Sequence, residues 1–598
     1  MSPEIILKHK KTLILPKIYF NKMRTIPSFL ELKRNIKNIQ TDSKKIRVAL
    51  LGDSATQFIH TALKGMALEE RISIELYEAE YDQIRQEILD TDSELYHFQP
   101  EFVIIFHSHQ KLNKSFYKKS LDKKPEFAQN WLSELEYFLG ILNENLKTNI
   151  LLFNFPETDD SVFGHFANKT SYSFPFQVRN INFHLMLLSQ KIKNLFIVDI
   201  NHIQASFGRN QITDAKIYIT ADTIFSIEFI PHVARAVIDI ILPFTGRFKK
   251  CVILDLDNTT WGGIIGDDGI ENIQIGDLGI GKAFTELQLW VKQLKERGII
   301  LAVCSKNTEH IAKEPFEQHP DMVLRLEDIA VFVANWENKA DNIRYIQSIL
   351  NIGFDSMVFL DDNPFERNIV RLNIPDITVP ELPEDPAEYL PYLRTLNLFE
   401  TISFTEEDNQ RTKQYQEEAG RAILQQKFTN EDEFLENLEM ECIVEPVTKF
   451  SLPRVAQLTQ RSNQFNLRTV RYSEEDVQKK IVDNPDMFSL TFTLKDKYGD
   501  YGLISVLFLE KQADTYFIDT WIMSCRVLKR NVENFVLNAI VDLAKEHGIN
   551  AILGEYLPTA KNGMVKDHFE NLGFSSSGAL WRLEVGEYEP KKHYILRK

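Results

Sequence analysis

A short apolar run followed by two closely spaced acids is the feature that most constrains this chain. Residues Cys251 to Leu254 are apolar and precede the segment Asp255-Leu256-Asp257-Asn258-Thr259. Such a run predicts a buried parallel strand, and ligands of open α/β sheets bind at the carboxyl ends of their strands. In an extended segment Asp255 and Asp257 lie on the same side of the backbone. One carboxylate can act as nucleophile while the other moves a proton, or both can face a divalent cation, so the sequence predicts an enzyme.

Composition narrows the class of protein. The 598 residues predict three or four domains, and 43% hydrophobic with 26% charged residues is ordinary globular composition. A net charge of −16 argues against nucleic acid as the main partner. The four scattered cysteines form no CxxC motif, which favours a reducing compartment without a disulfide framework or zinc site. There is no apolar run of about 18 residues, so we expect no membrane association and a cytoplasmic protein.

The order of strand and helix patterns predicts five segments. Residues 1–45 form a basic extension, expected to be solvated and partly ordered. Strand–helix alternation predicts α/β domains with mostly parallel sheets over 46–246 and 247–400. Residues 401–430 contain a charged amphipathic stretch that predicts a connecting helix. Residues 431–598 predict an α+β domain, because the strands MFSLTFTLKD, GLISVLFLE and TYFIDTWIMSC follow one another closely enough for antiparallel pairing.

Three further features of the 247–400 segment point to the same sheet edge. The strand IILAVCS ends at Ser305, followed by Lys306 and Asn307, where a hydroxyl and free helix N–H groups can seat a phosphate. Lys339 begins a helical pattern, and the strand SMVFL ends in Asp361-Asp362. Each feature alone is a common turn or helix cap. Their occurrence together, each at a predicted element end, favours a site where paired acids bind Mg²⁺.

This order of motifs resembles the haloacid dehalogenase-like (HAD) phosphotransferase superfamily, with a Rossmann-like parallel sheet. The resemblance implies that Asp255 is the nucleophile and Asp257 the general acid and base. It implies that Thr259 and Ser305 orient phosphoryl oxygens and that Lys339 bridges the nucleophile and the phosphate. The implied metal ligands are Asp255, Asp257, Asp361 and Asp362, and the implied substrate-binding residues are Asn307, Gly262, Gly263, Asn363 and Arg526.

Longer motifs narrow the resemblance to the FkbH-type branch of that superfamily. They are DLDNTTWGGIIGDDG, LAVCSKN, NWENKADNI, FLDDNPFERNIVR, LTQRSNQFNLRTVRYSEEDV and WIMSCRV. The resemblance implies a protein that takes a glyceryl unit from 1,3-bisphosphoglycerate, removes its phosphate and loads it on the phosphopantetheine thiol of an acyl carrier protein. Cys304 and Cys525 are then candidates to hold a glyceryl thioester, although free cysteines are usually small buried hydrophobes. Two alternatives stay open: a phosphatase acting on another small phosphorylated metabolite, and a scaffold that binds a carrier protein.

The flanking segments resemble two other folds and depart from both. Gly52-Asp53-Ser54 resembles the first motif of SGNH-type hydrolases, whose fold is a flavodoxin-type parallel sheet. The chain has His107-Ser108-His109-Gln110 where a Gly and an Asn are expected, and Phe229 three residues before His232 where an Asp is expected, which favours docking over hydrolysis. The last segment resembles the GNAT acyltransferase fold. Lys529 and Asn531 stand where glycines cradle coenzyme A, but Arg526 and its basic neighbours could hold the phosphate of a pantetheine arm.

Overall fold

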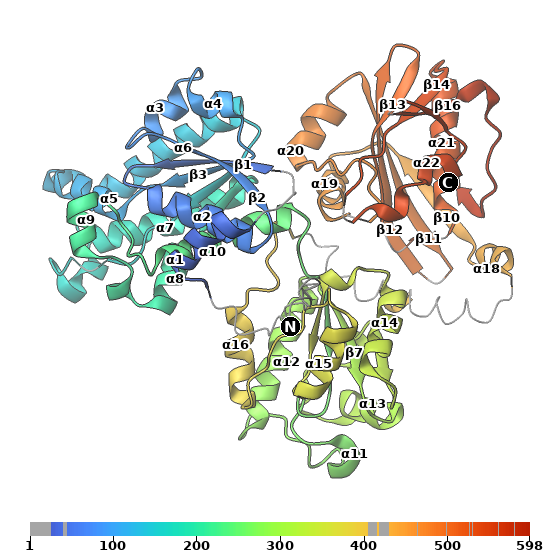
Figure 1. The fold of residues 1–598 in the computed structure, drawn as a ribbon, viewed down its shortest axis with the longest axis horizontal. Helices are drawn as coiled ribbons and strands as arrows, with labels where there is room; N and C mark the ends of the chain where they lie inside the picture. Colours follow the sequence, from blue (N-terminus) through green and yellow to red (C-terminus); the bar gives the residue numbers. More distant parts are fainter. Residues whose placement is uncertain are drawn as a thin grey trace, which may run out of the picture.

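The computed structural model describes residues 26–39, 45–158, 160–404, 415–417, 430–462, 464–497, 499–524, 527–528, 530–559, 561–578 and 580–598. Within these residues the strands form three sheets, and each sheet builds its own lobe (Figure 1). We call these the N-terminal lobe (to residue 246), the central lobe (247–404) and the C-terminal lobe (from residue 430). The predicted connecting helix lies outside the described residues apart from 415–417. No described helix is both long and apolar enough to cross a membrane.

The N-terminal lobe is a parallel sheet covered by helices on both faces. Its strands run in the order β2-β1-β3-β4-β5. The strands are β1 (Lys45–Gly52), β2 (Ser73–Glu78), β3 (Phe102–Phe106), β4 (Asn149–Phe153) and β5 (Leu195–Val198). The helices are α1 (Phe29–Asn38), α2 (Gln57–Glu69), α3 (Ile84–Leu89), α4 (Glu94–Phe98), α5 (His109–Tyr117), α6 (Phe127–Asn145), α7 (Phe174–Lys191), α8 (Ile200–Phe207), α9 (Ala215–Ala221) and α10 (Ile230–Phe244).

Part of the predicted basic extension is instead a packed helix. Ser28 and Glu31 form a reciprocal capping box that starts α1, and Leu32 of this helix is fully buried. The backbone of Leu32 lies so close to α2 that a Cβ on Gly65 would come within 2.3 Å of its carbonyl oxygen. Only a glycine at residue 65 permits this approach, so α1 belongs to the N-terminal lobe. Residues 1–25 and 40–44 of the extension lie outside the described residues.

The central lobe holds the strand predicted first. Its parallel sheet has the order β8-β7-β6-β9, so β6 has a neighbour on each side. Along β6, Val252 and Leu254 enter one apolar core and Cys251 and Ile253 enter the core on the other face, which explains the unbroken apolar run. The strands are β6 (Cys251–Leu254), β7 (Ile300–Ser305), β8 (Val331–Ala334) and β9 (Met357–Leu360). The helices are α11 (Ile265–Asp268), α12 (Gly281–Glu296), α13 (Glu309–Gln318), α14 (Lys339–Leu350), α15 (Pro364–Asn373) and α16 (Tyr389–Thr395).

The C-terminal lobe is built on a mixed, mainly antiparallel sheet. The strand order is β15-β16-β14-β13-β12-β11-β10-β17, with parallel pairing only of β13 with β14 and β10 with β17 among the described strands. The strands are β10 (Met440–Glu445), β11 (Met487–Asp496), β12 (Gly499–Gln512), β13 (Thr515–Met523), β14 (Ala551–Gly554), β15 (Ser575–Ser577), β16 (Leu580–Glu584) and β17 (Ile595–Arg597). The helices are α18 (Glu431–Asn437), α19 (Leu452–Arg461), α20 (Glu474–Asp476), α21 (Val532–Glu546) and α22 (His568–Asn571).

Strands β13 and β14 diverge, and the chain itself fills the gap between them. Their pairing covers Thr515 to Phe517 of β13 alone. Beyond it, the segment 465–467 lies between the strands: the Met523 amide donates to the Phe465 carbonyl (3.2 Å) and the Leu557 amide donates to the Leu467 carbonyl (2.9 Å). The three residues of the segment are almost fully buried. The gap is therefore closed by a stretch of the same chain.

The three lobes meet at the amino ends of the central strands. The Lys250 amide, just before β6, donates to the carbonyl of Ser356, just before β9 (2.7 Å). From the C-terminal lobe, the Lys561 ammonium donates to the carbonyl of Gly246 (3.2 Å) and forms an ion pair with Asp355. Lys561 thus contacts both other lobes at the end of the sheet opposite to the carboxyl ends of the strands.

Candidate active site

The turn after β6 places the first acid at the middle of the sheet edge. The Asp255 amide still belongs to the sheet, because it donates to the Leu360 carbonyl of β9 (2.9 Å). The chain then turns: the amides of Thr259 and Thr260 both donate to the Leu256 carbonyl, at 3.1 and 2.7 Å. Asn258 takes a left-handed conformation in this turn (φ 54°), which asparagine tolerates better than most residues. The turn fixes Asp255 beside the ends of β7 and β9.

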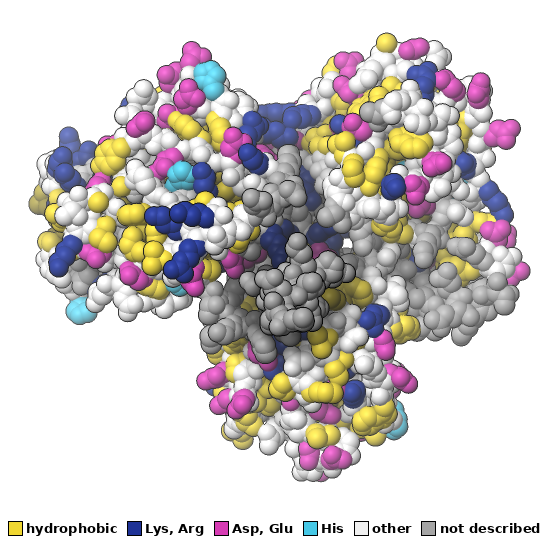
Figure 2. Space-filling view, in the orientation of Figure 1, with side chains coloured by type: hydrophobic (Ala, Val, Ile, Leu, Met, Phe, Trp, Pro, Cys, Tyr) yellow, Lys and Arg dark blue, Asp and Glu magenta, His cyan; other side chains and the backbone are white. Residues whose placement is uncertain are grey.

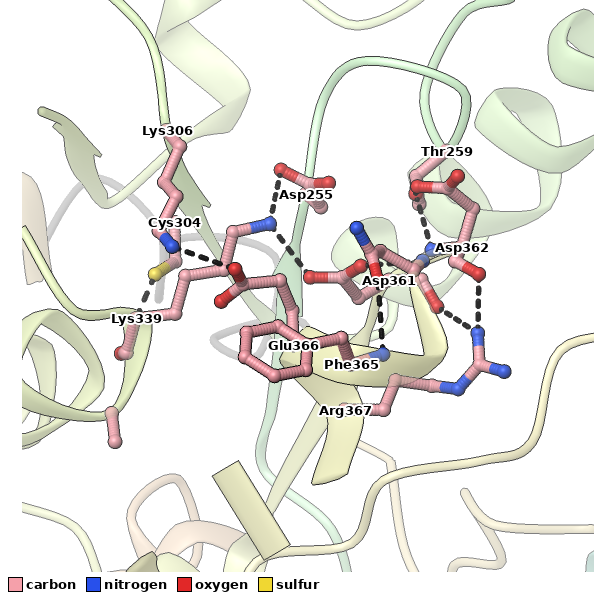
Figure 3. A network of polar contacts seen from close by, with 12 residues as sticks. Asp255, Thr259, Cys304, Lys306, Lys339, Asp361, Asp362, Phe365, Glu366 and Arg367 are labelled. Carbon is pink, nitrogen blue, oxygen red and sulfur yellow. Dashed lines mark hydrogen bonds and ion pairs between the residues drawn. The ribbon is translucent and has the colours of Figure 1, made fainter. Parts of the chain in front are cut away.

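Lys339 lies between two of the predicted acids. It is the first residue of α14, whose N-cap Asn338 accepts a hydrogen bond from the amide of Ala340. The Lys339 ammonium is 2.9 Å from Asp255 Oδ1 and 2.6 Å from Asp361 Oδ2 (Figure 3). Burial lowers the pKa of this ammonium, but the Asp255 and Asp361 carboxylates outweigh burial and raise it above its usual value. Lys339 is therefore a fixed positive charge inside an acidic site.

Three carboxylates converge beside this ammonium. One oxygen from each of Asp255, Asp361 and Asp362 lies within 4.8 Å of the others. Asp361 is fully buried, and burial together with the charge of Asp255 raises its pKa. The Asp362 carboxylate accepts a hydrogen bond from the Thr259 hydroxyl (3.2 Å), and this hydroxyl accepts one from the Asp362 amide (2.9 Å). Three hard oxygen donors that repel one another form a set that suits a small divalent cation.

Asp257 lies outside that acid cluster, although the sequence analysis included it among the metal ligands. One oxygen of its carboxylate accepts hydrogen bonds from the Trp261 indole and the Ile265 amide, both at 3.0 Å, and the other accepts one from the Asn307 amide group (3.2 Å). Burial, followed by the charge of Asp255, raises the pKa of Asp257 against these hydrogen bonds. Its side chain is therefore held by the turn after β6 and by the residues that follow β7.

The other predicted polar residues lie at the same edge. Ser305 is the last residue of β7 and is 1% exposed. Asn307 is also buried, and its oxygen accepts the Thr308 amide hydrogen bond while its nitrogen holds Asp257. Asn363 caps α15 by accepting from the Phe365 amide (2.9 Å), and its own amide donates to Asp361 Oδ1 (2.8 Å). Asn307 therefore helps to hold Asp257 in place, and Asn363 helps to hold Asp361.

Packing explains why residues 262 and 263, which were predicted to bind substrate, are glycines. A Cβ at Gly262 would lie 2.8 Å from the Phe284 ring, and Gly262 pairs with Gln274 through two backbone hydrogen bonds. Gly263 has a φ of 92°, and its Cβ would lie 2.6 Å from an Asp268 oxygen. Both positions thus require glycine because of packing, at Gly262 against α12 and at Gly263 against Asp268.

The cysteine predictions have different outcomes. Cys304 lies in β7 with its thiol fully buried and 3.7 Å from the Lys339 carbonyl oxygen. Burial raises the pKa of this thiol. A thiol that is neither exposed nor ionised cannot carry an acyl unit in this conformation, so Cys304 is corrected to a core residue. Cys525 and Arg526 lie outside the described residues.

Arg367 is a functional candidate that the sequence analysis missed. Its guanidinium donates to the carbonyl oxygens of Asp361 (2.7 Å) and Asp362 (2.6 Å), and to Glu381 (2.7 Å). It therefore fixes the backbone that presents both acids (Figure 3). Arg367 lies four residues after the helix cap Asn363, on the first turns of α15. This spacing is the sequence signal from which its role could have been predicted.

The residues that resemble a hydrolase motif do not form a catalytic relay in the N-terminal lobe. Ser54 follows β1, and its hydroxyl is buried without a hydrogen-bond partner among the described residues. The carboxylate of Asp53 instead accepts the Ser108 amide at 2.9 and 3.0 Å. His232, in α10, packs its ring against Phe207 and Phe229. The expected departure from hydrolase chemistry is consistent with these contacts.

Comparisons with known proteins found a family match for the N-terminal lobe and a solved relative that contains a phosphatase domain. Residues 47–242 match the family model "FkbH, N-terminal domain". A solved structure, the N-terminal part of a Bacteroides fragilis protein containing a phosphatase domain complexed with Mg, is 54% identical; the match covers 63% of this chain and 100% of that one, with a TM-score of 0.60. The Escherichia coli ribosomal-protein-S18-alanine N-acetyltransferase is 12% identical over 25% of this chain and 99% of that one, with a TM-score of 0.20, which assigns no fold. A search of curated proteins gave no match.

The parallel sheet with an acid cluster and a lysine at its edge defines a HAD-type phosphatase domain. Because the chain covers the whole of the Bacteroides fragilis relative at 54% identity, and its N-terminal lobe matches the FkbH model, the chain belongs to the FkbH-like family of HAD-type phosphatases.

Proposed function

We propose that the central lobe is a Mg²⁺-dependent phosphatase site for a small phosphorylated metabolite, with Asp255 as the nucleophile. The observation that carries this proposal is the position of Lys339, whose ammonium contacts Asp255 and Asp361 at 2.9 and 2.6 Å in a buried site. A carboxylate can approach an anionic phosphoryl group only if nearby positive charge offsets their repulsion.

The donor set fits a magnesium ion. Asp255, Asp361 and Asp362 would hold it, since all three offer carboxylate oxygens within 4.8 Å of one another and Mg²⁺ prefers oxygen ligands. The relative from Bacteroides fragilis, 54% identical, has its phosphatase domain complexed with Mg. When bound, the ion supplies positive charge that offsets the charge of the nucleophile and the phosphoryl oxygens.

Two steps follow for the protein's own residues. An Asp255 oxygen attacks phosphorus, the bond from phosphorus to the leaving oxygen breaks, and Asp257 gives its proton to that oxygen. Water then attacks the phosphorus of the aspartyl phosphate, Asp257 takes the water proton, and inorganic phosphate leaves as Asp255 is regenerated. The raised pKa of Asp257 suits the first of these roles. Thr259 and Ser305 would orient the phosphoryl oxygens.

The finer proposal concerns the acyl group. We propose a phosphoglyceryl donor resembling 1,3-bisphosphoglycerate and an acyl carrier protein as partner, because the sequence motifs resemble the FkbH-type branch, for which this reaction is implied. The phosphopantetheine thiol attacks the carbonyl carbon of the acyl phosphate, the carbon–oxygen bond to phosphate breaks, and the thiol proton passes to solvent. The remaining phosphate ester is then cleaved at Asp255. This leaves a glyceryl thioester on the carrier.

A plain phosphatase acting on another metabolite is the second candidate. The acid cluster lies at the carboxyl ends of the central strands, whereas the C-terminal lobe contacts their amino ends through Lys561 and Asp355. Cys304, the described cysteine nearest to the site, is buried. Phosphate removal needs neither the C-terminal lobe nor a thiol.

One experiment separates these candidates. The full chain is incubated with Mg²⁺, 1,3-bisphosphoglycerate and a phosphopantetheinylated carrier protein, and both proteins are weighed intact while phosphate release is measured. A glyceryl adduct on the carrier supports the transferase, and phosphate release without an adduct supports the plain phosphatase. The Asp255→Asn variant should leave the phosphate ester of the donor uncleaved, although phosphate displaced from the acyl phosphate by the carrier thiol can still be released. Asp267→Asn, an exposed acid outside the cluster, should match the wild type. Cleavage of the phosphate ester by Asp255→Asn would refute the assignment of the nucleophile.

A further inference from the structure

A cavity of about 490 Å³ lies between the central and C-terminal lobes. The central lobe lines it with residues before β6 and β9, and the C-terminal lobe with α19, the loop that follows it and the end of β13. Its volume falls in the range of small-molecule sites, about 300–1,000 Å³. Lys and Arg side chains are visible in the hollow where the lobes meet (Figure 2). We call this the junction cavity.

The junction cavity is separate from the phosphatase site. Ser356, which lines it, and Asp361, in the acid cluster, stand at opposite ends of β9. The four residues of β9 lie between them, so five residue-to-residue steps of about 3.3 Å separate the two by roughly 17 Å through the core of the sheet. One small ligand therefore cannot occupy both places.

The charge of the residues that line the junction cavity favours binding of an anion. Among the described lining residues, four side chains are cationic (Lys250, Arg454, Arg461 and Lys561) and two are acidic (Asp355 and Asp376). Asp355 is already paired with Lys561. The Lys561 hydrogen bond and the charges of Lys249 and Lys250 hold the pKa of Asp355 below its usual value despite burial. Cationic walls around a partly desolvated hollow attract phosphate strongly.

The rest of the wall suits an uncharged ligand body that forms hydrogen bonds. Hydroxyl and amide groups come from Ser356, Gln457, Ser462, Gln464 and Ser524. Apolar surface comes from Phe354, Leu458, Phe465 and Met523. A ligand that combines an anionic group with an uncharged polar body would use both the positive charge of the wall and these hydrogen-bonding groups.

We propose that the junction cavity binds a phosphate ester whose body is uncharged and rich in amide or hydroxyl groups. Such a group can arrive as a free small molecule or tethered to a protein, and both present the same chemistry to the cavity. The site is distinct from the proposed phosphatase and does not depend on it.

Binding is measured by calorimetry on the full chain in EDTA, so that the acid cluster contributes no metal-dependent phosphate site. The probes are pantetheine 4′-phosphate and pantetheine, which differ only in the phosphate, and a phosphopantetheinylated carrier protein. We expect the phosphorylated probe to bind at least tenfold more tightly than pantetheine. Lys250→Gln and Arg454→Gln should each weaken it by about 10- to 150-fold, which corresponds to the roughly 1.5–3 kcal/mol that a hydrogen bond to a charged group contributes. Lys282→Gln, an exposed lysine outside the lining, should leave it unchanged.

The outcomes separate cleanly. Binding of the carrier alone, lost in Lys250→Gln, supports a protein-tethered ligand, and binding of the free probe supports a diffusible one. Measurable and equal affinity for both pantetheine forms, no binding of any of the three probes, or no effect of Lys250→Gln and Arg454→Gln overturns the proposal. Loss of binding in Asp255→Asn would place the ligand in the phosphatase site and overturns it as well, whereas failure of phosphatase turnover alone leaves it standing.

Discussion

Replacing Lys339 by methionine removes the charge at the centre of the acid cluster while keeping most of the side-chain volume. The ammonium contacts Asp255 at 2.9 Å and Asp361 at 2.6 Å, and none of the three side chains is more than 8% exposed. Removing one partner of a buried ion pair costs about 3–5 kcal/mol. We therefore expect Lys339→Met, without metal at pH 8, to be destabilised by about that amount in the central lobe, because three carboxylates then face one another without compensation.

The effect should depend on pH in a defined direction. In the wild type the pKa of Lys339 is raised above 10.5, so its stabilising contribution is complete below that value and constant between pH 5 and 8. Burial and the charge of Asp255 already raise the pKa values of Asp361 and Asp362 above the unfolded value of about 3.9, and Lys339 opposes this rise, so its removal should raise both further. Such groups favour the folded state at low pH, and this contribution is lost as pH rises through the folded pKa. Lys339→Met should therefore approach wild-type stability near pH 5 and lose it towards pH 8.

Hydrogen exchange is the appropriate assay, because one unfolding free energy is not defined for a chain of several lobes. Peptides covering β6 and β9 should exchange about a hundredfold or more faster in Lys339→Met at pH 8, after correction for intrinsic rates. Added Mg²⁺ should restore part of the protection by supplying positive charge. Lys282→Met removes an exposed lysine and should cost less than about 1 kcal/mol. Wild-type protection in the variant without metal, or equal loss at pH 5 and pH 8, would refute the electrostatic reasoning.

Three further predictions concern single contacts. Thr259→Val removes the hydroxyl that holds the Asp362 side chain and amide. It should weaken Mg²⁺ affinity by roughly tenfold in a metal titration, since such supporting contacts typically change metal affinity by about 10–100-fold. Unchanged affinity would contradict the role of this contact. Cys304→Ala should lower stability by about 1 kcal/mol through lost packing and leave glyceryl loading intact by mass spectrometry, whereas loss of loading in a folded variant would reinstate the thiol. Lys561→Met removes the ammonium that contacts both other lobes; it should speed proteolysis between the lobes and change phosphatase kcat less than twofold, and a large fall in kcat would mean that the two ends of the central sheet are coupled.

The sequence predicted the centre of the site because each element there ends in a polar group of distinct type. Asp255, Lys339 and Asp361 were found from their places at strand or helix ends, and the structure brings them within hydrogen-bond distance. The orientation of Asp257 was not predictable from spacing, because the fold of the following loop turns its carboxylate towards Trp261 and Ile265. The packing that requires glycine at residues 262 and 263 was not predictable either, because it depends on how the loop lies against Phe284 and Asp268. Substrate binding by these two glycines stays a prediction.

Most of the longer strands were predicted from their apolar runs. β8 was missed although its four residues are as apolar as those of β6 and β9, because no acid or turn motif marks its end. β2 was missed because it is only half-buried, so its sequence is not a continuous apolar run. α1 was missed because the basic residues before it suggested a solvated arm. Its capping box of Ser28 and Glu31 is a local sequence signal that was overlooked, whereas the burial of Leu32 depends on a partner surface from α2. Contacts between lobes, such as those of Lys561, leave no local pattern in a single sequence.

The buried segment 465–467 sets a condition on any extended molecule that would dock on β13 through its main chain. Such a molecule would first have to displace Phe465 and Leu467, giving up their hydrogen bonds with Met523 and Leu557 and exposing two large apolar side chains to water. Binding between β13 and β14 would therefore be limited by how often the segment 465–467 leaves its place. The observed rate of binding would then level off as the concentration of the incoming molecule is raised.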